Sequence, residues 1–283
     1  DLGFLFPFRN PDFNRRPWDR LYRDDLDLAA YSETLGFDHV WLTEHHFIDD
    51  GYSPSLIPIA TAIGARTNTI RIGTFVMLLP MHQTVRLAED IATADVISGG
   101  RMDIGVGLGY RVGEFVGMGI SPRERGKRFA EQLPLLRQLL DGETVTFHGQ
   151  YHNIDGARIM PPAIQRPVPL WVGARGDRAL DRAARMGCHL AGVSAEHRLR
   201  YREALARHGR EPDNYMVSQM VLVYVSDSKE QAWNDTASPV NHMLQLYRDW
   251  AVEAGDDNND DQDSRAIPSA ARLRADQACD FFG

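Results

Sequence analysis

The sequence predicts an α/β fold, a (β/α)8 TIM barrel in which strands and helices alternate along the chain. Apolar runs of strand length alternate seven times with longer segments of helical periodicity, which is typical of a parallel sheet covered by helices. The alternative is an open, doubly wound sheet. No GxGxxG motif follows the first apolar run, which counts against a dinucleotide-binding version of that sheet. We expect one barrel domain over residues 1–283, with insertions and a trimmed C-terminus.

Local signals place the individual elements. Gly36 ends the first helical pattern, and Pro80 ends a long apolar strand pattern. The expected strands are 2–6, 39–43, 71–79, 102–106, 170–172, 189–193 and 216–225. The expected helices are about 18–35, 54–66, 84–97, 122–140, 177–186 and 195–208, with one more from about residue 228.

Three further segments complete the prediction. Residues 144–154 have the pattern of a short hairpin inserted between barrel elements. Residues 255–263 are acidic and contain no apolar side chain, which predicts a mobile surface loop. Phe281 and Phe282 could begin an eighth strand, which would close the barrel.

Composition excludes several classes of function. The chain is 43% hydrophobic and 25% charged, with a net charge of −8, which argues against nucleic acid or an anionic membrane as the main partner. Two cysteines without a CxxC spacing suggest neither a disulfide framework nor a zinc site, and they fit a reducing cytoplasm. No apolar run has membrane length.

Polar and glycine residues gather where the predicted strands end. In a barrel these strand exits meet on one rim, where chemistry is built. The mixture of glycines, apolar side chains, histidines and arginines suits a flat, partly apolar ligand with an anionic tail. The segment 173–177 precedes a helix, so its free N–H groups could hold a phosphate. The rim segments are 6–8, 44–47, 77–80, 107–111, 173–177 and 192–194.

Structural readings of the same residues stay open. Glu44-His45-His46 could be a hydrogen-bonded turn, and the glycine-rich exit at Gly107 and Gly109 could be an ordinary tight turn. Adjacent histidines on a strand cannot easily chelate one ion, and no HExxH accompanies them, so we expect no metal. No nucleophile elbow supports hydrolase chemistry.

Several motifs together resemble the bacterial luciferase-like flavin monooxygenases. The resemblance runs through about residues 1–195 in order and at similar spacing, whereas the C-terminal third matches weakly. The segments that carry it are 36–47 (GFDHVWLTEHHF), 71–74, 79–80, 85–90, 100–107 (GRMDIGVG), 125–129 and 169–173.

The resemblance implies a cofactor and partners. Members of the family bind reduced FMN, or in a sister branch the deazaflavin coenzyme F-420, at the C-terminal mouth of the barrel. FMN members use O2 to oxidise a small organic substrate and receive their flavin from a separate NAD(P)H:flavin reductase. Deazaflavin members are dehydrogenases or reductases that transfer hydride. The family also implies a homodimer. A non-catalytic flavin-binding protein is a third hypothesis, against which the Glu44-His45-His46 cluster argues.

The resemblance also assigns roles to residues. His45 matches the catalytic histidine of the family, and Phe75–Val76 lies where members have a non-proline cis peptide under the flavin ring. Substrate contacts are expected from Phe6, His46 and Phe47. Flavin contacts are expected from Glu44, Phe75, Val76, Met77, Gly107, Gly109, Tyr110, Arg111, Ala174, Arg175, Gly176, Asp177, Val193 and Ser194.

Two positions depart from the family pattern. Leu108 stands where luciferase has a phosphate-contacting arginine, and Arg175 stands where luciferase has an acidic residue. The anionic tail of the cofactor could therefore be held by Arg111 or Arg175, and the deazaflavin coenzyme stays open. The Glu-His-His-Phe motif favours FMN.

Overall fold

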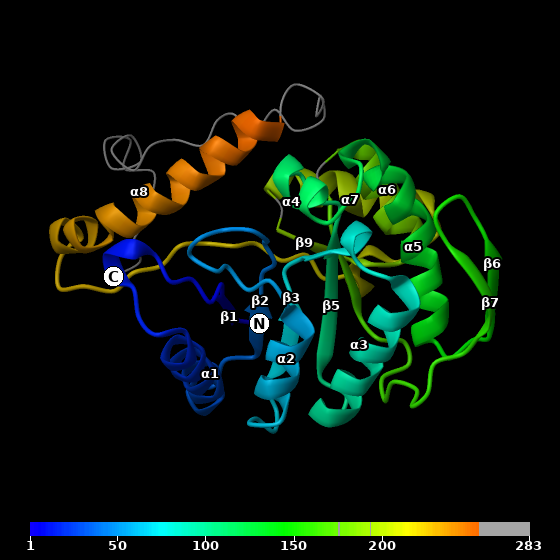
Figure 1. Ribbon diagram of the computed structural model, residues 1–283, viewed down its shortest axis with the longest axis horizontal. Helices are drawn as coiled ribbons and strands as arrows, with labels where there is room; N and C mark the ends of the chain where they lie inside the picture. The colour runs from blue at the N-terminus through cyan, green and yellow to red at the C-terminus, as the bar shows by residue number, and fades with distance from the viewer. Residues whose placement is uncertain (175, 193, 255–283) are drawn as a thin grey trace. The chain divides into compact units, whose positions relative to one another are not determined.

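The computed structural model describes residues 1–174, 176–192 and 194–254 (Figure 1). The chain divides into two compact units. The first unit comprises residues 1–109 and 113–218 and contains the sheet with its covering helices. The second unit comprises residues 110–112 and 219–283, and its described part contains the helix α8 (Lys229–Ala254). A single barrel domain over the whole chain stays a prediction.

A curled parallel sheet forms the centre of the first unit, in the order β1-β2-β3-β5-β8-β9, with β4 paired to β5. Gly3 lies opposite His39 and His39 opposite Arg71, so neighbouring strands run in the same direction and in simple register. This arrangement confirms the predicted α/β fold of the barrel type. The strands are β1 (Gly3–Phe6), β2 (His39–Leu42), β3 (Arg71–Thr74), β4 (Met77–Leu78), β5 (Met102–Gly107), β8 (Leu170–Gly173) and β9 (His189–Ala191).

Helices follow the strands as the alternating pattern predicts (Figure 1). The predicted hairpin is also present, as the antiparallel strands β6 (Val145–His148) and β7 (Asn153–Ala157) beside α5. The α-helices of this part of the chain are α1 (Trp18–Thr34), α2 (Leu56–Gly64), α3 (Thr84–Ser98), α4 (Val112–Gly117), α5 (Arg125–Leu140), α6 (Asp177–Met186) and α7 (Ala195–Arg207). The short 3-10 helices are η1 (Asp12–Asn14), η2 (Leu79–Met81), η3 (Pro122–Glu124) and η4 (Pro212–Asn214).

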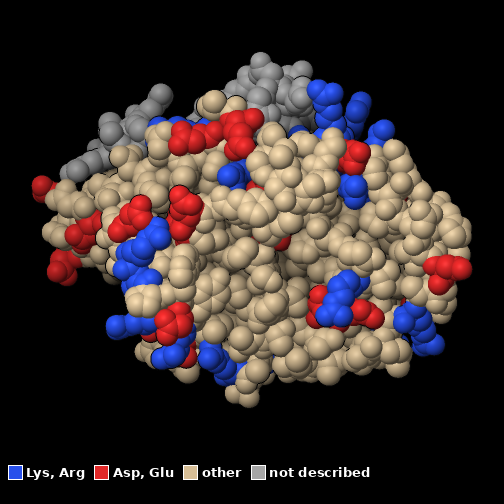
Figure 2. Space-filling view, viewed as in Figure 1, with Lys and Arg blue, Asp and Glu red and all other residues tan. Residues whose placement is uncertain are grey.

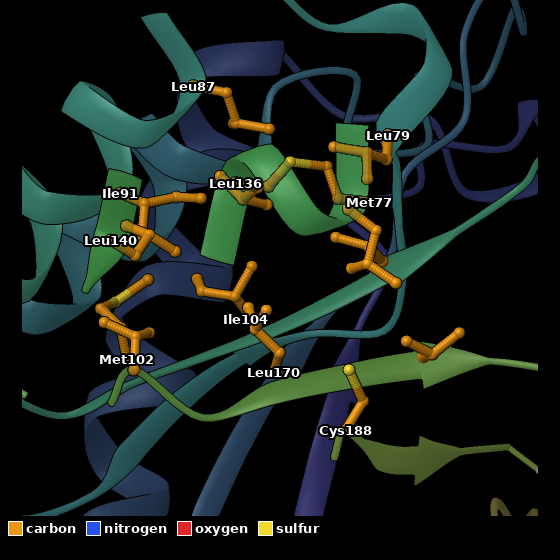
Figure 3. Close-up of a cluster of buried hydrophobic side chains, with 14 of the residues drawn as sticks. Met77, Leu79, Leu87, Ile91, Met102, Ile104, Leu136, Leu140, Leu170 and Cys188 are labelled. Carbon is orange, nitrogen blue, oxygen red and sulfur yellow. The ribbon is translucent and has the colours of Figure 1, made fainter. Parts of the chain in front are cut away.

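The core lies between the sheet and the helices that cover it (Figure 3). Ile104 of β5 and Leu170 of β8 pack in one cluster with Ile91 of α3 and Leu136 of α5, and all four side chains are buried. Removing this apolar surface from water is the main force that holds the helices on the sheet. The rim loops are thus carried on a packed scaffold.

The predicted strand 71–79 is interrupted in the structure. It is divided into β3 and β4 at Phe75–Val76, where the peptide bond is cis although residue 76 is not proline. The cis peptide that the resemblance implied at this position is confirmed. The prediction of one continuous strand was wrong, because the apolar pattern runs through residues 75–76 and no residue there signals a break.

The predicted strand 216–225 was also wrong. Val217 makes one isolated parallel bridge with Leu190, and residues 218–226 are not assigned to any strand. The side chains of residues 220–225 are exposed. A run of apolar residues forms a strand only when a neighbouring strand supplies partners for its backbone hydrogen bonds. The predicted loop 255–263 and strand start at Phe281 and Phe282 lie outside the described residues.

Arg101 joins the ends of two helices to the sheet. Its guanidinium donates to the carbonyl oxygens of Gly64, the last residue of α2, and of Thr67, just beyond that helix, each at 2.8 Å. It also donates to the carbonyls of Ile70 at 2.8 Å and Ser98 at 2.5 Å. One side chain therefore donates to four carbonyl groups, two of which, those of Gly64 and Ser98, end the helices α2 and α3.

Replacing Arg101 by Ala is expected to lower the free energy of unfolding by about 2–4 kcal/mol, because several part-buried carbonyls lose their donor at once. Urea denaturation followed by circular dichroism measures this loss. The matched control is Arg66→Ala, an exposed arginine nearby, which should change stability by less than about 0.5 kcal/mol. Equal stability of the two variants would contradict the role given to Arg101.

Candidate active site

The polar segment Glu44-His45-His46 follows the end of β2 after a single residue, Thr43. All three side chains are buried, with exposed fractions of 2%, 6% and 6%. The backbone N–H of His45 donates to the carbonyl of Tyr52 at 3.2 Å, and the Tyr52 ring stands edge-on to the His45 ring, with centroids 4.6 Å apart. The loop therefore fixes both the backbone and the ring of His45.

His45 is paired with a carboxylate that comes from a different element. Its Nδ1 lies 2.9 Å from Oε1 of Glu114, a buried residue of α4. The same oxygen accepts the backbone N–H of His46 at 2.8 Å. A carboxylate oxygen accepts hydrogen bonds, so we assign the proton of the neutral His45 ring to Nδ1 and the lone pair to Nε2. This tautomer makes Nε2 the proton-accepting atom.

Glu44 is the centre of a second buried cluster. Its Oε1 accepts hydrogen bonds from Nε2 of His46 at 2.9 Å and from Nε2 of His82 at 3.0 Å. Its Oε2 accepts the backbone N–H of Leu78 at 2.6 Å. Burial alone would raise the pKa of the Glu44 carboxyl, but the bonds from His46, His82 and Leu78 outweigh it and lower the pKa to about 2. Glu44 is therefore ionised at neutral pH and orients its neighbours rather than delivering a proton.

The lowered pKa of Glu44 predicts a loss of stability in acid. Since the folded-state pKa is about 2 against an ordinary 4.5, Glu44 contributes stability above pH 4.5 that disappears as the pH falls toward 2. The linked free energy is about 3 kcal/mol. We expect Glu44→Gln to unfold more readily than the wild type at neutral pH, and the difference to shrink on acidification.

Urea denaturation at several pH values measures this difference. The control is Glu143→Gln, which removes an exposed carboxylate and should track the wild type at every pH. A Glu44→Gln deficit that stays constant between neutral pH and about pH 3 would contradict the ionised, hydrogen-bonded state of Glu44.

The break between β3 and β4 forms a close-packed floor beside the strand exits. A Cβ on Gly107 would lie 2.4 Å from Cγ2 of Val76, and a Cβ on Gly192 would lie 3.1 Å from the ring of Phe75. Both glycines are therefore needed for the packing of these two side chains. The ring of Trp41 stands edge-on to Phe75, with centroids 5.8 Å apart. The result is a close-packed, largely apolar surface.

The loops after β8 and β9 lead into helix N-termini. Ala174 is buried at the end of β8, and Gly176 precedes α6, which begins at Asp177 without a side-chain cap. Asp177 forms an ion pair with Arg200 at 3.1 Å. The side chain of Ser194 caps α7. The first N–H groups of α6 therefore form the better candidate for an anion such as a phosphate. Arg175 and Val193, which were predicted to bind the flavin, lie outside the described residues.

Four other predicted site residues have different surroundings. Phe6 and Met77 are buried in the hydrophobic core. Gly109 has a φ of 75°, and a Cβ there would lie 3.0 Å from the ring of Phe115. Backbone conformation and packing therefore explain the glycine at this position without a ligand. Phe47 is 60% exposed. Their roles as substrate or flavin contacts stay predictions.

Tyr110 and Arg111 belong to the second unit. There the Arg111 guanidinium lies over the ring of Trp250, 5.0 Å from its centroid, and its Nε is 3.7 Å from Glu253. Arg111 is thus engaged by α8 within its own unit. The proposed contact of Tyr110 and Arg111 with the flavin stays a prediction.

Comparison with known proteins adds the decisive observation. A family model described as luciferase-like monooxygenase matches residues 1–282. The chain belongs to this family. The resemblance predicted from the motifs is thereby confirmed, including for the C-terminal third, where those motifs are weak.

Curated relatives of this luciferase-like chain include two kinds of oxidoreductase. It is 33% identical over 251 residues to 4-hydroxyprotoasukamycin monooxygenase of Streptomyces nodosus subsp. asukaensis, covering 82% of this chain and 66% of that one. It is 32% identical over 228 residues to an F420-dependent glucose-6-phosphate dehydrogenase of Nakamurella multipartita, covering 74% and 66%. The chain spans about half to two thirds of the length of the first curated relatives it matches.

Solved structures share the fold. The monooxygenase RslO1 of Streptomyces bottropensis matches with a TM-score of 0.80 at 24% identity, covering 98% of this chain and 88% of that one. The oxygenating constituent of 3,6-diketocamphane monooxygenase of Pseudomonas putida, a complex with FMN, matches with a TM-score of 0.76 at 18% identity, covering 90% and 77%. Both likenesses concern the fold alone.

Three further features of this luciferase-like chain concern possible partners: its surface charge, the length of its helices and its potential metal ligands. Figure 2 shows one face, on which acidic and basic side chains stand in mixed groups. Ion pairs of the chain include Arg16 with Asp24 at 3.0 Å and Arg86 with Asp90 at 2.8 Å. Among the described helices, none combines the length and the apolar character that a bilayer crossing requires. In the same residues, no three potential ligand side chains converge as on a metal ion.

Two residues of the site escaped prediction from the sequence. Glu114 lies 69 positions beyond His45, and His82 lies 38 positions beyond Glu44. The only local signal for Glu114 is a carboxylate within the mostly apolar segment 112–118. His82 lies in the loop that follows Pro80, where a polar side chain carries no signal of its own. Only the fold brings both to the Glu44-His45-His46 segment.

Proposed function

We propose that the chain is the oxygenase of a two-component monooxygenase that uses reduced FMN and O2 to oxidise a small organic substrate. The observation that supports this most is the buried pair of His45 and Glu114, which sets Nε2 of His45 as a proton acceptor at the strand exits. A monooxygenase relative shares 33% identity over 82% of the chain. A separate NAD(P)H:flavin reductase would deliver the reduced flavin, and a homodimer is part of the proposal.

The residues present fit a flavin. The floor of Phe75 and Val76, packed closely against Gly107 and Gly192, offers an apolar surface for a ring system. The uncapped first turn of α6, after Gly176, offers N–H groups for a phosphate. Reduced FMN, when bound, supplies the electrons and the reactivity toward O2, which no protein side chain provides.

The protein would contribute orientation and proton transfer. His45 takes up a proton at Nε2 and returns it, while Glu114 holds Nδ1–H and stabilises the imidazolium that forms. Glu44, ionised and bonded to His46 and His82, fixes the neighbouring ring and the loop before η2. Burial of these groups keeps water from competing for their hydrogen bonds.

A second candidate is hydride transfer with coenzyme F-420 on the same scaffold. The 32% identity to an F420-dependent dehydrogenase supports it, and the same histidine could serve as the proton donor or acceptor. The third candidate, flavin binding without turnover, gives no reason for burying two carboxylate–histidine pairs, an arrangement that is costly unless it is fully hydrogen-bonded.

Oxygen dependence tests the proposal. The chain, FMN, NADH and a flavin reductase are incubated with a panel of aldehydes, ketones and aromatic acids, and substrate loss is followed with and without air. The proposal expects turnover only in air, with one atom from labelled O2 in the product. Turnover of alcohols without air, with F-420 as acceptor, would replace it by the second candidate.

A further inference from the structure

A cavity of about 350 Å³ lies in the first unit, next to the Glu44 cluster. It is lined by residues 80–83, Ile120, Arg128 and residues 151–154, which come from η2, the loop before η3, α5 and the start of β7. Its size is within the range of small-molecule sites, near the lower end. His82 lines the cavity and also bonds to Glu44, so the cavity and the candidate active site share one side chain.

Three basic side chains line this cavity, and each is held by a carboxylate. Nε2 of His82 lies 3.0 Å from Glu44, and Nδ1 of His152 lies 3.3 Å from Glu131. Nε of Arg128 donates to Glu124 at 3.2 Å, and its guanidinium lies 4.8 Å from the centroid of the Tyr151 ring. These contacts orient the three groups and leave their remaining nitrogens for other partners. The pairs are His82–Glu44, His152–Glu131 and Arg128–Glu124.

Those remaining nitrogens have no hydrogen-bond partner within residues 1–174, 176–192 and 194–254. They are Nδ1 of His82, Nε2 of His152, and the two terminal nitrogens of Arg128. Gln83 and Asn153 are the other polar side chains at the wall. An arginine presents a planar fork of donors that matches a carboxylate or phosphate, and two histidines add donors when protonated.

We propose that this cavity binds a small oxyanion, a phosphate or carboxylate group, between Arg128, His82 and His152. The carboxylates that pair with these basic groups, Glu44, Glu124 and Glu131, do not line the cavity themselves, so the anion would meet the donors rather than the negative charges. Because each neutral histidine already donates through the nitrogen that faces its glutamate, it becomes a donor toward the cavity only on protonation. Anion binding and protonation of the two rings therefore reinforce each other.

Isothermal titration calorimetry with inorganic phosphate tests this site, with succinate as a second probe and chloride at matched ionic strength as the blank. The expected result is binding that is tighter at about pH 6 than at about pH 8. Arg128→Gln should weaken it about tenfold or more, the loss that follows from removing a charge-assisted hydrogen bond. Whether phosphate or succinate binds more tightly identifies the preferred oxyanion.

Lys127→Gln is the matched control, since it removes one positive charge from the preceding, exposed position of α5. It should bind phosphate as the wild type does. Equal weakening of phosphate binding in the two variants would overturn the proposal. So would phosphate binding that chloride at the same ionic strength abolishes. Either result would mean that phosphate senses only the general positive charge of the surface.

If Arg128→Gln folds poorly, nuclear magnetic resonance of the wild type replaces it. The ring protons of His82 and His152 should shift on addition of phosphate, while those of His148, an exposed histidine of the same hairpin, should not. No selective shift would reject the site. Neither measurement requires flavin or turnover, so the outcome is independent of the proposed oxygenase function.

Discussion

Replacing His45 by Ala is expected to lower turnover about 100- to 10,000-fold, while the affinity for reduced flavin changes only a few-fold. The physical reason is that Nε2 of His45 is the proton acceptor that Glu114 orients, whereas the flavin ring would rest on the Phe75–Val76 floor. Steady-state kinetics gives the turnover, and anaerobic fluorescence titration gives the affinity. This pattern separates chemistry from binding.

His148→Ala is the control for this prediction, because His148 is an exposed histidine at the end of β6. It should retain wild-type turnover and flavin affinity. Near-normal turnover in the His45 variant would remove His45 from the mechanism. A large loss of flavin affinity with unchanged turnover at saturating flavin would make it a binding residue instead.

Replacing Glu114 by Gln is expected to reduce turnover about 10- to 100-fold with little change in flavin affinity. The glutamine can still offer an oxygen, but its amide is uncharged and can also rotate to present a donor. The imidazolium of His45 then loses its counter-charge, and the ring loses its single tautomer. Glu114 acts through His45, so it is a positioning residue.

Nitrogen chemical shifts of His45 distinguish this role from a merely structural one. The wild type should show a neutral ring protonated at Nδ1, whereas Glu114→Gln should show a mixture of tautomers. Glu114→Asp keeps the charge on a shorter side chain and should recover part of the turnover. An unchanged Nδ1–H tautomer in Glu114→Gln, together with full turnover, would contradict the pairing.

The parallel sheet could be predicted because its signal is local. Strands such as β5 are buried along their whole length, with Met102, Ile104 and Val106 on one face, and a glycine or proline marks the ends of several elements, as Gly36 and Pro80 do. The position of the cis peptide at Phe75–Val76 came from the family resemblance and not from any physical signal in those two residues. The same apolar run gave no sign that the strand would divide there.

The partners within the site could not be predicted for a different reason. The adjacent carboxylate and histidines identify the segment 44–46, but their hydrogen bonds reach Glu114 and His82, which the fold alone brings close. The segment 216–225 shows the converse failure. Its apolar run shows which side chains are apolar, not whether another strand is there to pair with, and among its described residues only Val217 makes a bridge to a strand.

The most direct test of the proposed function is a paired anaerobic titration with reduced FMN and with coenzyme F-420, followed by flavin absorbance and fluorescence. The FMN arm ends with the addition of air. The oxygenase account predicts tight binding of reduced FMN, weak binding of F-420, and reoxidation of the bound flavin that is slower than that of free reduced FMN. Selective binding of F-420 would contradict it and would assign hydride transfer to this luciferase-like scaffold.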